Sequence, residues 1–511
     1  MAVPAERKRV AVVGSGVAGL SCAYLLARKH DVAIFEREKA VGMDAHSLDA
    51  HGARMDIPLR VFSESYYPNL TNLYNLVGIK YHVADYSFCC LAGGTKQAAA
   101  AYFRYVNFLW RGSAFPVPAL FHLRQLVKCA RLGGAFAHFL KYSPGYLTSS
   151  PEVADLSLED FLGRFGYSPE FGTELLYPML SVVCTCSYAA VAAYPAAIVV
   201  DYFANKYGLS GAQCRAYEGT RDVVDRLTAG VARVVTSATI VKAEAAGATS
   251  LAGVACKLRW RDAAGVEHVE EFDEIVLAMQ ANASAKVLLS PHAPQLDALK
   301  RFEYEMKRVV LHTDAALMPP HKRDWSPLNL CITPGEDAAS VTVWMNRIDS
   351  HLASELSRSV FQTWNPVTEP EASTVIADFS FERPVVNAAS VKAIADLQGT
   401  QGHGHVRGRA RHPARRPAIA PFRHPRRSPP PPPRAQVWFV GAYSRYSMPL
   451  LENGVKSAMV VARALGVDTS DVEFDEAAHA NQVASRTLIY SLLVLLFAVA
   501  LTAVHASYHF F

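Results

Sequence analysis

The chain has 511 residues, which is too many for one hydrophobic core and predicts two or three interleaved domains. Apolar residues make up 51% and charged residues 19%, so fibrous and disordered classes are excluded. The formal net charge is +5, but nine arginines and no acid lie in 403–435, and the rest of the chain is acidic. Because a duplex-binding protein needs basic residues across a folded face, nucleic acid is not expected as a partner.

Nine cysteines are present, and none forms a CxxC pair. We expect reduced thiols that lie mostly in the core, since no spacing indicates a redox disulfide. No cluster of residues has the spacing of metal ligands or of a Ser/His/Asp triad. The sequence therefore predicts no metal site and gives no support to a hydrolase.

The first predicted element is a strand over 9–13, followed by a glycine loop and a helix over 20–29. Gly14 is expected to make the tight turn, Gly16 to let the backbone approach a pyrophosphate, and Gly19 to let helix and strand pack closely. The start of the helix offers free N–H groups to phosphates. The loop has the GxGxxG pattern and consists of Gly14, Ser15, Gly16, Val17, Ala18 and Gly19.

A second strand is predicted over 32–35 and ends at Glu36. A carboxylate at this distance from the glycine loop can accept hydrogen bonds from the ribose hydroxyls of a dinucleotide. An acid here also argues against a 2′-phosphate. Strand, loop, helix, strand and acid in this order predict a dinucleotide site, and leave FAD and NAD open.

The residues after Glu36 resemble a known group of flavoproteins. The motifs are REKAVGM at 37–43 with its glycine at Gly42, residues 55–57 and 66–70, 312–314 with 317–319 and Trp325, and 364–366. The chain is similar to flavin-containing amine-oxidase-like enzymes over about residues 8–467, apart from 403–435. Its branch is that of predicted FAD/NAD-binding amine oxidoreductases, some of which are fused to, or encoded beside, cyclopropane-fatty-acid-synthase-type lipid methyltransferases.

A second glycine motif favours FAD. Residues 437–443 read as a buried strand that ends at Gly441, and Glu452-Asn453-Gly454 opens a helix over 455–465. In similar flavoproteins this strand and helix close the site over the flavin, which a domain that binds only NAD does not need. The resemblance implies an FAD site formed by Gly14, Ser15, Gly16, Val17, Ala18, Gly19, Glu36, Arg37, Gly42, Val235, Gly441, Glu452, Gly454 and Val455.

Two residues are candidates for catalysis. In amine-oxidase-like folds a lysine at the start of a substrate-domain strand can hold a water against the flavin, and Lys307 fits that position; the alternative is a solvated lysine at a strand edge. His312 and Asp314 lie two apart on a predicted strand over 309–317, so they would share a face and could orient substrate. The alternative for this pair is a structural hydrogen bond.

The substrate is expected to be hydrophobic and lipid-like. Residues 102–146 are aromatic and aliphatic, which predicts helices that line an apolar pocket or rest on a membrane, or plain core helices. Leu450 stands where monoamine-oxidase-like enzymes carry an aromatic residue, which disfavours amines. The predicted function is FAD-dependent oxidation or desaturation by hydride transfer; the alternatives are an amine or carotenoid-type oxidase and a flavin-binding protein without turnover.

The remaining predicted elements fit an interleaved arrangement. A β-rich stretch at 232–240, hairpin strands at 257–260 and 268–272, and a buried strand at 274–278 would continue the nucleotide-binding part. A strand at 340–345 would belong to the substrate-domain sheet.

The C-terminal third contains two unusual segments. Residues 403–435 hold nine prolines and nine arginines, which predicts a disordered insertion, either a surface arm or a mistranslated intron. Residues 487–504 carry no charge and predict a single transmembrane anchor with the flavin domains on the cytosolic side; a buried helix is the alternative.

The predicted fold class is α/β, with a Rossmann-like FAD-binding domain interleaved with an α+β substrate domain, plus a C-terminal transmembrane helix. The predicted boundaries are 1–95, 215–295 and 436–467 for the FAD-binding domain, 96–214 and 296–402 for the substrate domain, 403–435 for the insertion, 468–486 for an acidic linker and 487–505 for the anchor.

Overall fold

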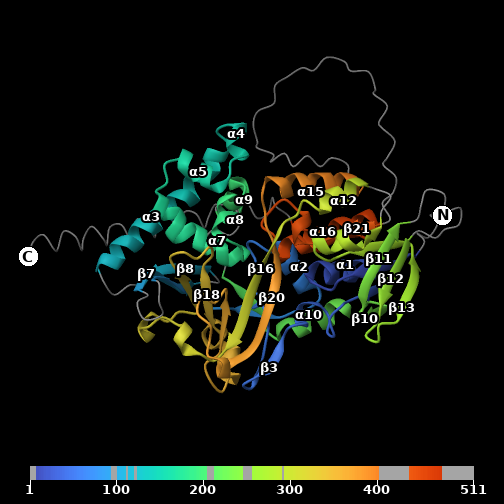
Figure 1. Cartoon of the computed structure of the whole chain (residues 1–511), viewed down its shortest axis with the longest axis horizontal. Coiled ribbons are helices and arrows are strands. Elements are labelled where there is room, and N and C mark those ends of the chain that lie inside the picture. The colour runs from blue at the N-terminus through green and yellow to red at the C-terminus, as the bar shows by residue number, and fades with distance from the viewer. Residues whose placement is uncertain are drawn as a thin grey trace, which may run out of the picture.

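The structure is a computed structural model of the whole chain (Figure 1). The predicted insertion, the predicted anchor and most of the predicted acidic linker lie outside the residues that it describes. Within the described ranges no helix is both long and apolar enough to cross a membrane. These ranges are 7–93, 100–110, 113–119, 123–203, 212–245, 256–289, 293–401 and 437–474.

A five-stranded parallel sheet forms the nucleotide-binding part. Four of its strands are almost wholly buried apolar runs, as expected for a parallel sheet covered on both faces, and only the short edge strand, residues 233–235, is largely exposed. The predicted strands at 9–13, 32–35, 274–278 and 437–443 are confirmed, with ends that differ by at most four residues. In sheet order the strands are β10 (Arg233–Val235), β2 (Asp31–Phe35), β1 (Arg9–Val13), β14 (Glu274–Leu277) and β21 (Val437–Phe439).

Alternate side chains of this sheet enter two separate cores. Val10 and Val12 face the large core, with helices α1 (Val17–Ala27), α16 (Leu451–Ala464), α10 (Gly219–Thr228) and α2 (Pro68–Leu76). Ala11 and Val13 face a smaller core. Figure 1 shows α1 and α16, from opposite ends of the chain, side by side. The period of two along the strands therefore decides which core each side chain enters.

The smaller core is covered by a four-stranded sheet and three helices. The predicted hairpin at 257–272 is confirmed as β12 and β13. These elements are β11 (Thr239–Ala245), β12 (Cys256–Arg261), β13 (Glu267–Phe272), β15 (Leu288–Leu289), α11 (Ala281–Val287), α12 (Ala293–Leu299) and α15 (Ala388–Thr400).

An eight-stranded mixed sheet forms the other half of the molecule. All its neighbouring pairs are antiparallel except β17 with β6. In sheet order the strands are β20 (Val375–Pro384), β16 (Tyr304–His312), β19 (Phe361–Trp364), β18 (Ser340–Trp344), β17 (Leu328–Ile332), β6 (Phe88–Ala92), β7 (Ala100–Trp110) and β8 (Ser113–Pro118).

Helices cover one side of this sheet, as the teal ribbons of Figure 1 show. They are α3 (Leu123–Leu147), α4 (Pro151–Ala154), α5 (Leu158–Arg164), α6 (Pro169–Phe171), a π-helical turn (Gly172–Leu176), α7 (Tyr177–Cys184), α8 (Tyr188–Ala192) and α9 (Ala196–Val200). Two shorter helices are α13 (Met345–Ile348) and α14 (Ser350–Glu355). Two small sheets have two strands each: β3 (Leu48–Ala50) pairs with β4 (Ala53–Met55), and β5 (Tyr81–Val83) pairs with β9 (Cys214–Ala216).

The prediction of helices throughout 102–146 is wrong in its first part. Residues 100–110 and 113–118 pair as strands β7 and β8, and helix α3 spans Leu123–Leu147. The reason is that aromatic and β-branched residues in the run YFRYVNF fit a pleated sheet better than a helix. The cysteines follow expectation: all nine are free, and only Cys331 is not fully buried.

Candidate functional site

The glycine loop after β1 has the conformation that the sequence predicts. Gly14 has a φ of +94°, and a Cβ there would lie 2.7 Å from the Ala278 carbonyl oxygen. A Cβ on Gly19 would lie 2.0 Å from the Gly14 carbonyl oxygen, so helix α1 packs tightly against the loop. A Cβ on Gly16 would meet no protein atom within 4 Å. The start of α1 therefore faces open space at Gly16, the glycine where the protein backbone is expected to approach a pyrophosphate.

Glu36 lies beside this loop at the end of β2. It is only 8% exposed, and its carboxylate accepts hydrogen bonds from the Ser15 backbone N–H at 3.0 Å and from the Ser15 hydroxyl. The Glu38 backbone N–H also donates to it, at 3.0 Å. A carboxylate held in this way is fixed next to the glycine loop before any ligand binds.

Three further predicted cofactor residues surround the same point. Gly42 has a φ of +62°, and a Cβ there would lie 2.0 Å from the Ser15 carbonyl oxygen, so the segment after β2 folds back onto the loop. The Val235 carbonyl accepts a hydrogen bond of 2.8 Å from the Glu36 N–H. Arg37 is exposed and forms an ion pair with Glu38 at 3.0 Å.

The start of α16 meets the start of α1. A Cβ on Gly454 would lie 2.8 Å from Val17 Cγ1, so the two helices touch at their first turns. Gly441 is held by a hydrogen bond from its N–H to the Ser457 hydroxyl at 3.0 Å. The fold thus brings Gly454 and Val455 next to Val17 and Ala18, although about 435 residues separate them in the sequence.

Glu452 makes its contacts with the protein itself. The side chain is 3% exposed, and its carboxylate accepts from the backbone N–H groups of Asn69 at 3.3 Å and Leu70 at 3.1 Å, and from the Asn69 amide. Lys456 lies 3.5 Å away as an ion-pair partner. Because Asn69 and Leu70 belong to the first turn of α2, Glu452 caps that helix and fixes it against α16.

Lys307 lies on the inner face of the eight-stranded sheet, the face whose neighbours Val309 and Leu311 join the large core. It is 9% exposed, and its ammonium pairs with Glu305 at 3.0 Å. Glu305 also accepts from the N–H and hydroxyl of Ser187, each at 2.8 Å. Burial alone would raise the pKa of Glu305, but the bonds from Lys307 and Ser187 hold it below its usual value. Lys307 is therefore a positioned, largely desolvated cation and not a solvated edge residue.

His312 does not share that face. It lies an odd number of residues from Lys307 on β16, so its side chain points to the opposite side of the sheet. Its Nδ1 accepts a bond of 3.1 Å from the Asp314 backbone N–H, and its Nε2 lies 2.7 Å from the Thr363 hydroxyl. The ring is completely buried.

The expectation that His312 and Asp314 share a strand face is wrong. The strand ends at His312, and the Asp314 carboxylate accepts from the Ala316 N–H at 2.8 Å to cap a 3₁₀ turn over Ala315–Leu317. The pairing of β16 with β19 and β20 stops at His312, so the extended period does not continue to Asp314.

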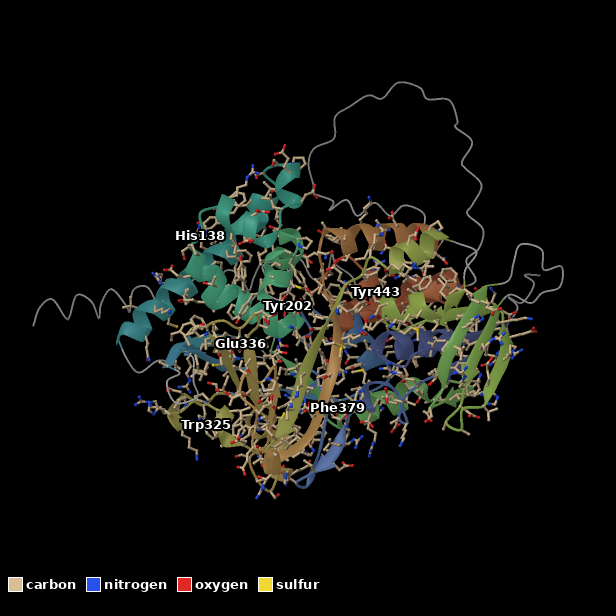
Figure 2. All side chains as sticks on the ribbon, in the orientation of Figure 1. His138, Tyr202, Trp325, Glu336, Phe379 and Tyr443 are labelled. Atoms are coloured by element: carbon tan, nitrogen blue, oxygen red, sulfur yellow. The ribbon has the colours of Figure 1, made fainter. Side chains whose placement is uncertain are left out.

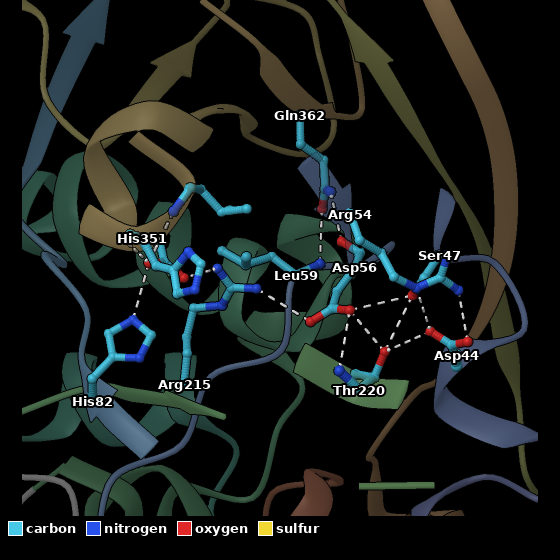
Figure 3. Close-up of polar contacts among 12 residues, drawn as sticks. Asp44, Ser47, Arg54, Asp56, Leu59, His82, Arg215, Thr220, His351 and Gln362 are labelled. Atoms are coloured by element: carbon cyan, nitrogen blue, oxygen red, sulfur yellow. Dashed lines mark hydrogen bonds and ion pairs between the residues drawn. The ribbon is translucent and has the colours of Figure 1, made fainter. Parts of the chain in front are cut away.

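A buried ionic network joins the two halves of the molecule (Figure 3). Arg215 on β9 bridges Asp56, at 3.2 Å, and Asp349, which also lies 3.0 Å from His82 Nε2. Burial would raise the pKa of Asp349, but His82 and Arg215 lower it to about 2. The Thr220 hydroxyl donates to Asp56 at 2.7 Å. No local sequence pattern indicates this network, because its members come together only in the folded chain.

Two half-buried arginines also escaped the sequence analysis. Arg60 and Arg383 each have a buried Nε without a hydrogen-bond partner, and no ion pair joins either one to a carboxylate in the described ranges. Burial and the nearby charge of Arg383 together lower the pKa of Arg60 to about 10.

Comparisons with known proteins agree with this geometry. Residues 12–76 match the family of NAD(P)-binding Rossmann-like domains. A CLA-producing fatty acid isomerase from P. acnes superposes with a TM-score of 0.54 at 14% identity, over 89% of this chain and 98% of that one. A candidate protoporphyrinogen oxidase from Exiguobacterium sp. 255-15 gives a TM-score of 0.54 at 12% identity, over 90% and 99%. No curated protein sequence matches significantly.

At these identities the structures show a common fold and not a common substrate. The Rossmann-like match and the shared fold bear out, at the level of the fold, the resemblance to the flavin-containing amine-oxidase-like superfamily that the motifs indicate.

Proposed function

We propose that the protein is an FAD-dependent oxidoreductase that oxidises or desaturates a hydrophobic, lipid-like substrate. The observation that carries the proposal is the open space at Gly16, bounded by the first turn of α1 and by the buried carboxylate of Glu36. A helix start with free N–H groups and a neighbouring acid is the arrangement that binds the diphosphate and ribose of a dinucleotide.

The residues present fit FAD. The N–H groups of Val17 and Ala18 have no partner within their own helix and would face the diphosphate. Glu36 would accept the ribose hydroxyls, and Ser15 is its present partner. The contact between α1 and α16 supports FAD over NAD, because the second helix start adds a further positive end to the same region.

Bound FAD would accept a hydride from a substrate C–H bond, and the protein would supply orientation and electrostatics. Lys307 is fixed by Glu305, which Ser187 holds in turn, so its ammonium keeps one position on the inner face. A positioned cation at that face can hold a water or a developing negative charge. His312 points away from this face and is proposed to have a structural role only.

The proposed lipid-like substrate is supported by the apolar character of the large core. In that core Tyr66 packs against Tyr67 and Tyr202 (Figure 2), with ring centroids 5.1 and 4.7 Å apart, and the sulfur atoms of Met448 and Cys184 lie 3.6 Å apart. The similarity in fold to a fatty acid isomerase points the same way. The location proposed for the protein is a membrane, through the uncharged C-terminal segment.

The absorption spectrum of the purified protein, before and after incubation with FAD, tests the cofactor. Anaerobic bleaching of the flavin band with long-chain fatty acids, compared with a panel of amines, tests the substrate. We expect bleaching by the lipids only, and slower bleaching in Lys307→Met than in the control Lys300→Met, whose lysine is exposed. A protein that cannot take up FAD would refute the function, and bleaching by amines alone would refute the substrate class.

A further inference from the structure

We propose that the β7–β8 hairpin and the start of α3 form a surface that contacts an anionic lipid bilayer. This inference goes beyond the proposed function, because it concerns neither the cofactor nor the substrate. It also does not depend on the uncharged segment at 487–504. It is carried by a hairpin that projects from the sheet, by exposed apolar side chains on that hairpin, and by a long stretch of sequence without acids.

The hairpin extends past the neighbouring strand of the eight-stranded sheet. β6 pairs with residues 100–105 of β7, whereas β8 pairs with residues 105–110 on the opposite edge. Residues 106–110 and 113–118 therefore form a two-stranded ribbon with no further strand beside it among the described residues. Figure 1 shows β7, β8 and α3 at one end of the molecule and β13 at the other. A two-stranded ribbon has little stability of its own in water, so a contact with a partner would stabilise it.

One face of this ribbon exposes apolar side chains. Val106 and Val117 form a cross-strand pair and are 39% and 44% exposed. Phe108 lies two residues along β7 on the same face and is 60% exposed. The opposite face of β7 is already used, because the Tyr105 ring packs against Phe88 with ring centroids 4.3 Å apart. Clustered apolar exposure of this kind marks a surface that contacts a protein or a membrane.

The start of α3 adds an apolar residue and two cations. Val127 is 63% exposed. Its neighbour Lys128 lies over a tyrosine ring of β7, 4.5 Å from the ring centroid, and pairs with Glu174 at 2.7 Å, so the helix is held against the hairpin strand. The Arg131 side chain is 59% exposed, and its ion-pair partner Glu170 lies 3.9 Å away. Long cationic side chains keep their charge at a membrane surface while apolar neighbours enter the lipid.

The charge of the surrounding sequence selects the partner. Between Asp85 and Glu152 the chain holds seven lysines and arginines and no acid. Two such surfaces would repel each other, which disfavours a second copy of the chain as the partner. An added strand is disfavoured too, because Pro116 and Pro118 remove backbone donors from β8, which lies at the edge of the sheet. Anionic head groups with acyl chains behind them fit both the cations and the apolar side chains.

The contact would be reversible. A few apolar side chains and cations bind a bilayer much more weakly than a transmembrane segment does. The surface would therefore orient the protein at a bilayer without anchoring it, and salt would release a chain that is held by this surface alone.

The test places an environment-sensitive fluorophore on the hairpin of the full-length protein. Phe108→Cys is labelled with a thiol-reactive nitrobenzoxadiazole, and Val269→Cys, at an exposed position of β13, is the matched control. Wild type treated with the same reagent gives the background, since only Cys331 among its cysteines is not fully buried. The vesicles contain phosphatidylcholine with about 30% phosphatidylserine, whose anionic head groups attract cations.

The label at position 108 should shift its emission to the blue when vesicles are added. It should also lose about half of its emission when the acyl chains carry bromine, because apolar groups at an interface lie roughly 5–10 Å into the head-group boundary. The label at position 269 should not respond. Vesicles of phosphatidylcholine alone should quench position 108 about tenfold less, since the cations lose their attraction. Val106→Ser with Val117→Ser, added to Phe108→Cys, should reduce the quenching by a similar factor.

Absence of quenching at position 108, or equal quenching at positions 108 and 269, would overturn the proposal. Equal quenching by the two kinds of vesicle would overturn the choice of an anionic surface. A blue shift at position 108 that appears without vesicles and grows with protein concentration would show that a second copy covers the hairpin, and the inference would be wrong.

Discussion

Two alanine substitutions in the glycine loop should have opposite consequences. Gly19→Ala places a Cβ 2.0 Å from the Gly14 carbonyl oxygen, where ordinary contacts are more than 1 Å longer, so helix α1 must move away from β1. Overpacking of this kind costs about 1–3 kcal/mol of folding free energy. Gly16→Ala meets no protein atom within 4 Å, and Gly16 has a φ of −62° that alanine adopts freely.

The expected free-energy changes at Gly16 nearly cancel. Alanine is a poorer helix N-cap than glycine, which destabilises the folded protein by roughly 0.5 kcal/mol. Alanine also lowers the chain entropy of the unfolded state, which stabilises the folded protein by about 0.4–1 kcal/mol. The apoprotein of Gly16→Ala should therefore unfold like wild type. Its added methyl group would occupy the space proposed for the diphosphate and should weaken FAD binding roughly tenfold to a hundredfold.

The assay compares thermal unfolding of the apoproteins by circular dichroism with FAD titration by quenching of flavin fluorescence. Gly19→Ala should lose thermal stability, and Gly16→Ala should lose affinity alone. FAD binding by Gly16→Ala at wild-type strength would show that the cofactor does not approach this backbone. A wild-type unfolding temperature for Gly19→Ala would show that the contact with Gly14 is relaxed at little cost.

Three further outcomes are expected. Glu452→Ala should lower the free energy of unfolding by about 3 kcal/mol, because it leaves two buried N–H groups of α2 unpaired. Glu452→Gln keeps an acceptor oxygen and should lower it by only about 1 kcal/mol. Equal losses for the two variants in urea unfolding would contradict this. Because the folded-state pKa of Asp349 is lowered from 3.8 to about 2, its contribution is present above pH 4 and lost as the pH falls toward 2. The stability difference between wild type and Asp349→Asn should therefore shrink from roughly 2 kcal/mol over that interval, and a constant difference would refute the linkage. Removal of all residues after Arg486 should move the protein from the membrane to the soluble fraction while it keeps FAD; a full-length chain that already fractionates as soluble would refute the anchor.

The parts of the fold predicted well from sequence depend on local chemistry. The β1 strand, the glycine loop and the β12–β13 hairpin follow from apolar runs and from glycines with specific backbone needs, and these are visible within about 15 residues. The β7–β8 hairpin was missed because an aromatic run fits both a helix and a strand until its partner is known. Its pairing with β6 decides the outcome, and a local pattern does not show which strand will pair with it.

The candidate site was predictable only where a motif names its residues. Spacing alone predicts Gly14, Gly16 and Glu36, and the structure places them around one loop, but their roles toward a dinucleotide stay predictions. That His312 and Asp314 do not share a face was not predictable, because the sequence does not show that β16 ends at His312. The buried Nε atoms of Arg60 and Arg383 have no hydrogen-bond partner, and only the tertiary structure reveals this.

The pairing of β14 with β21 has a consequence for synthesis of the chain. β21 is translated about 420 residues after β1, yet both strands belong to one sheet, and α16 must reach α1 before their first turns meet. At roughly 5–20 residues per second, β1 and α1 leave the ribosome some 20–85 s before the strand and helix that complete their sheet. The nascent nucleotide-binding half therefore waits with an open sheet edge and an uncovered apolar helix face, which is the condition that recruits chaperones. Cofactor uptake should accordingly be a late event, after the chain has been released from the exit tunnel at least as far as α16.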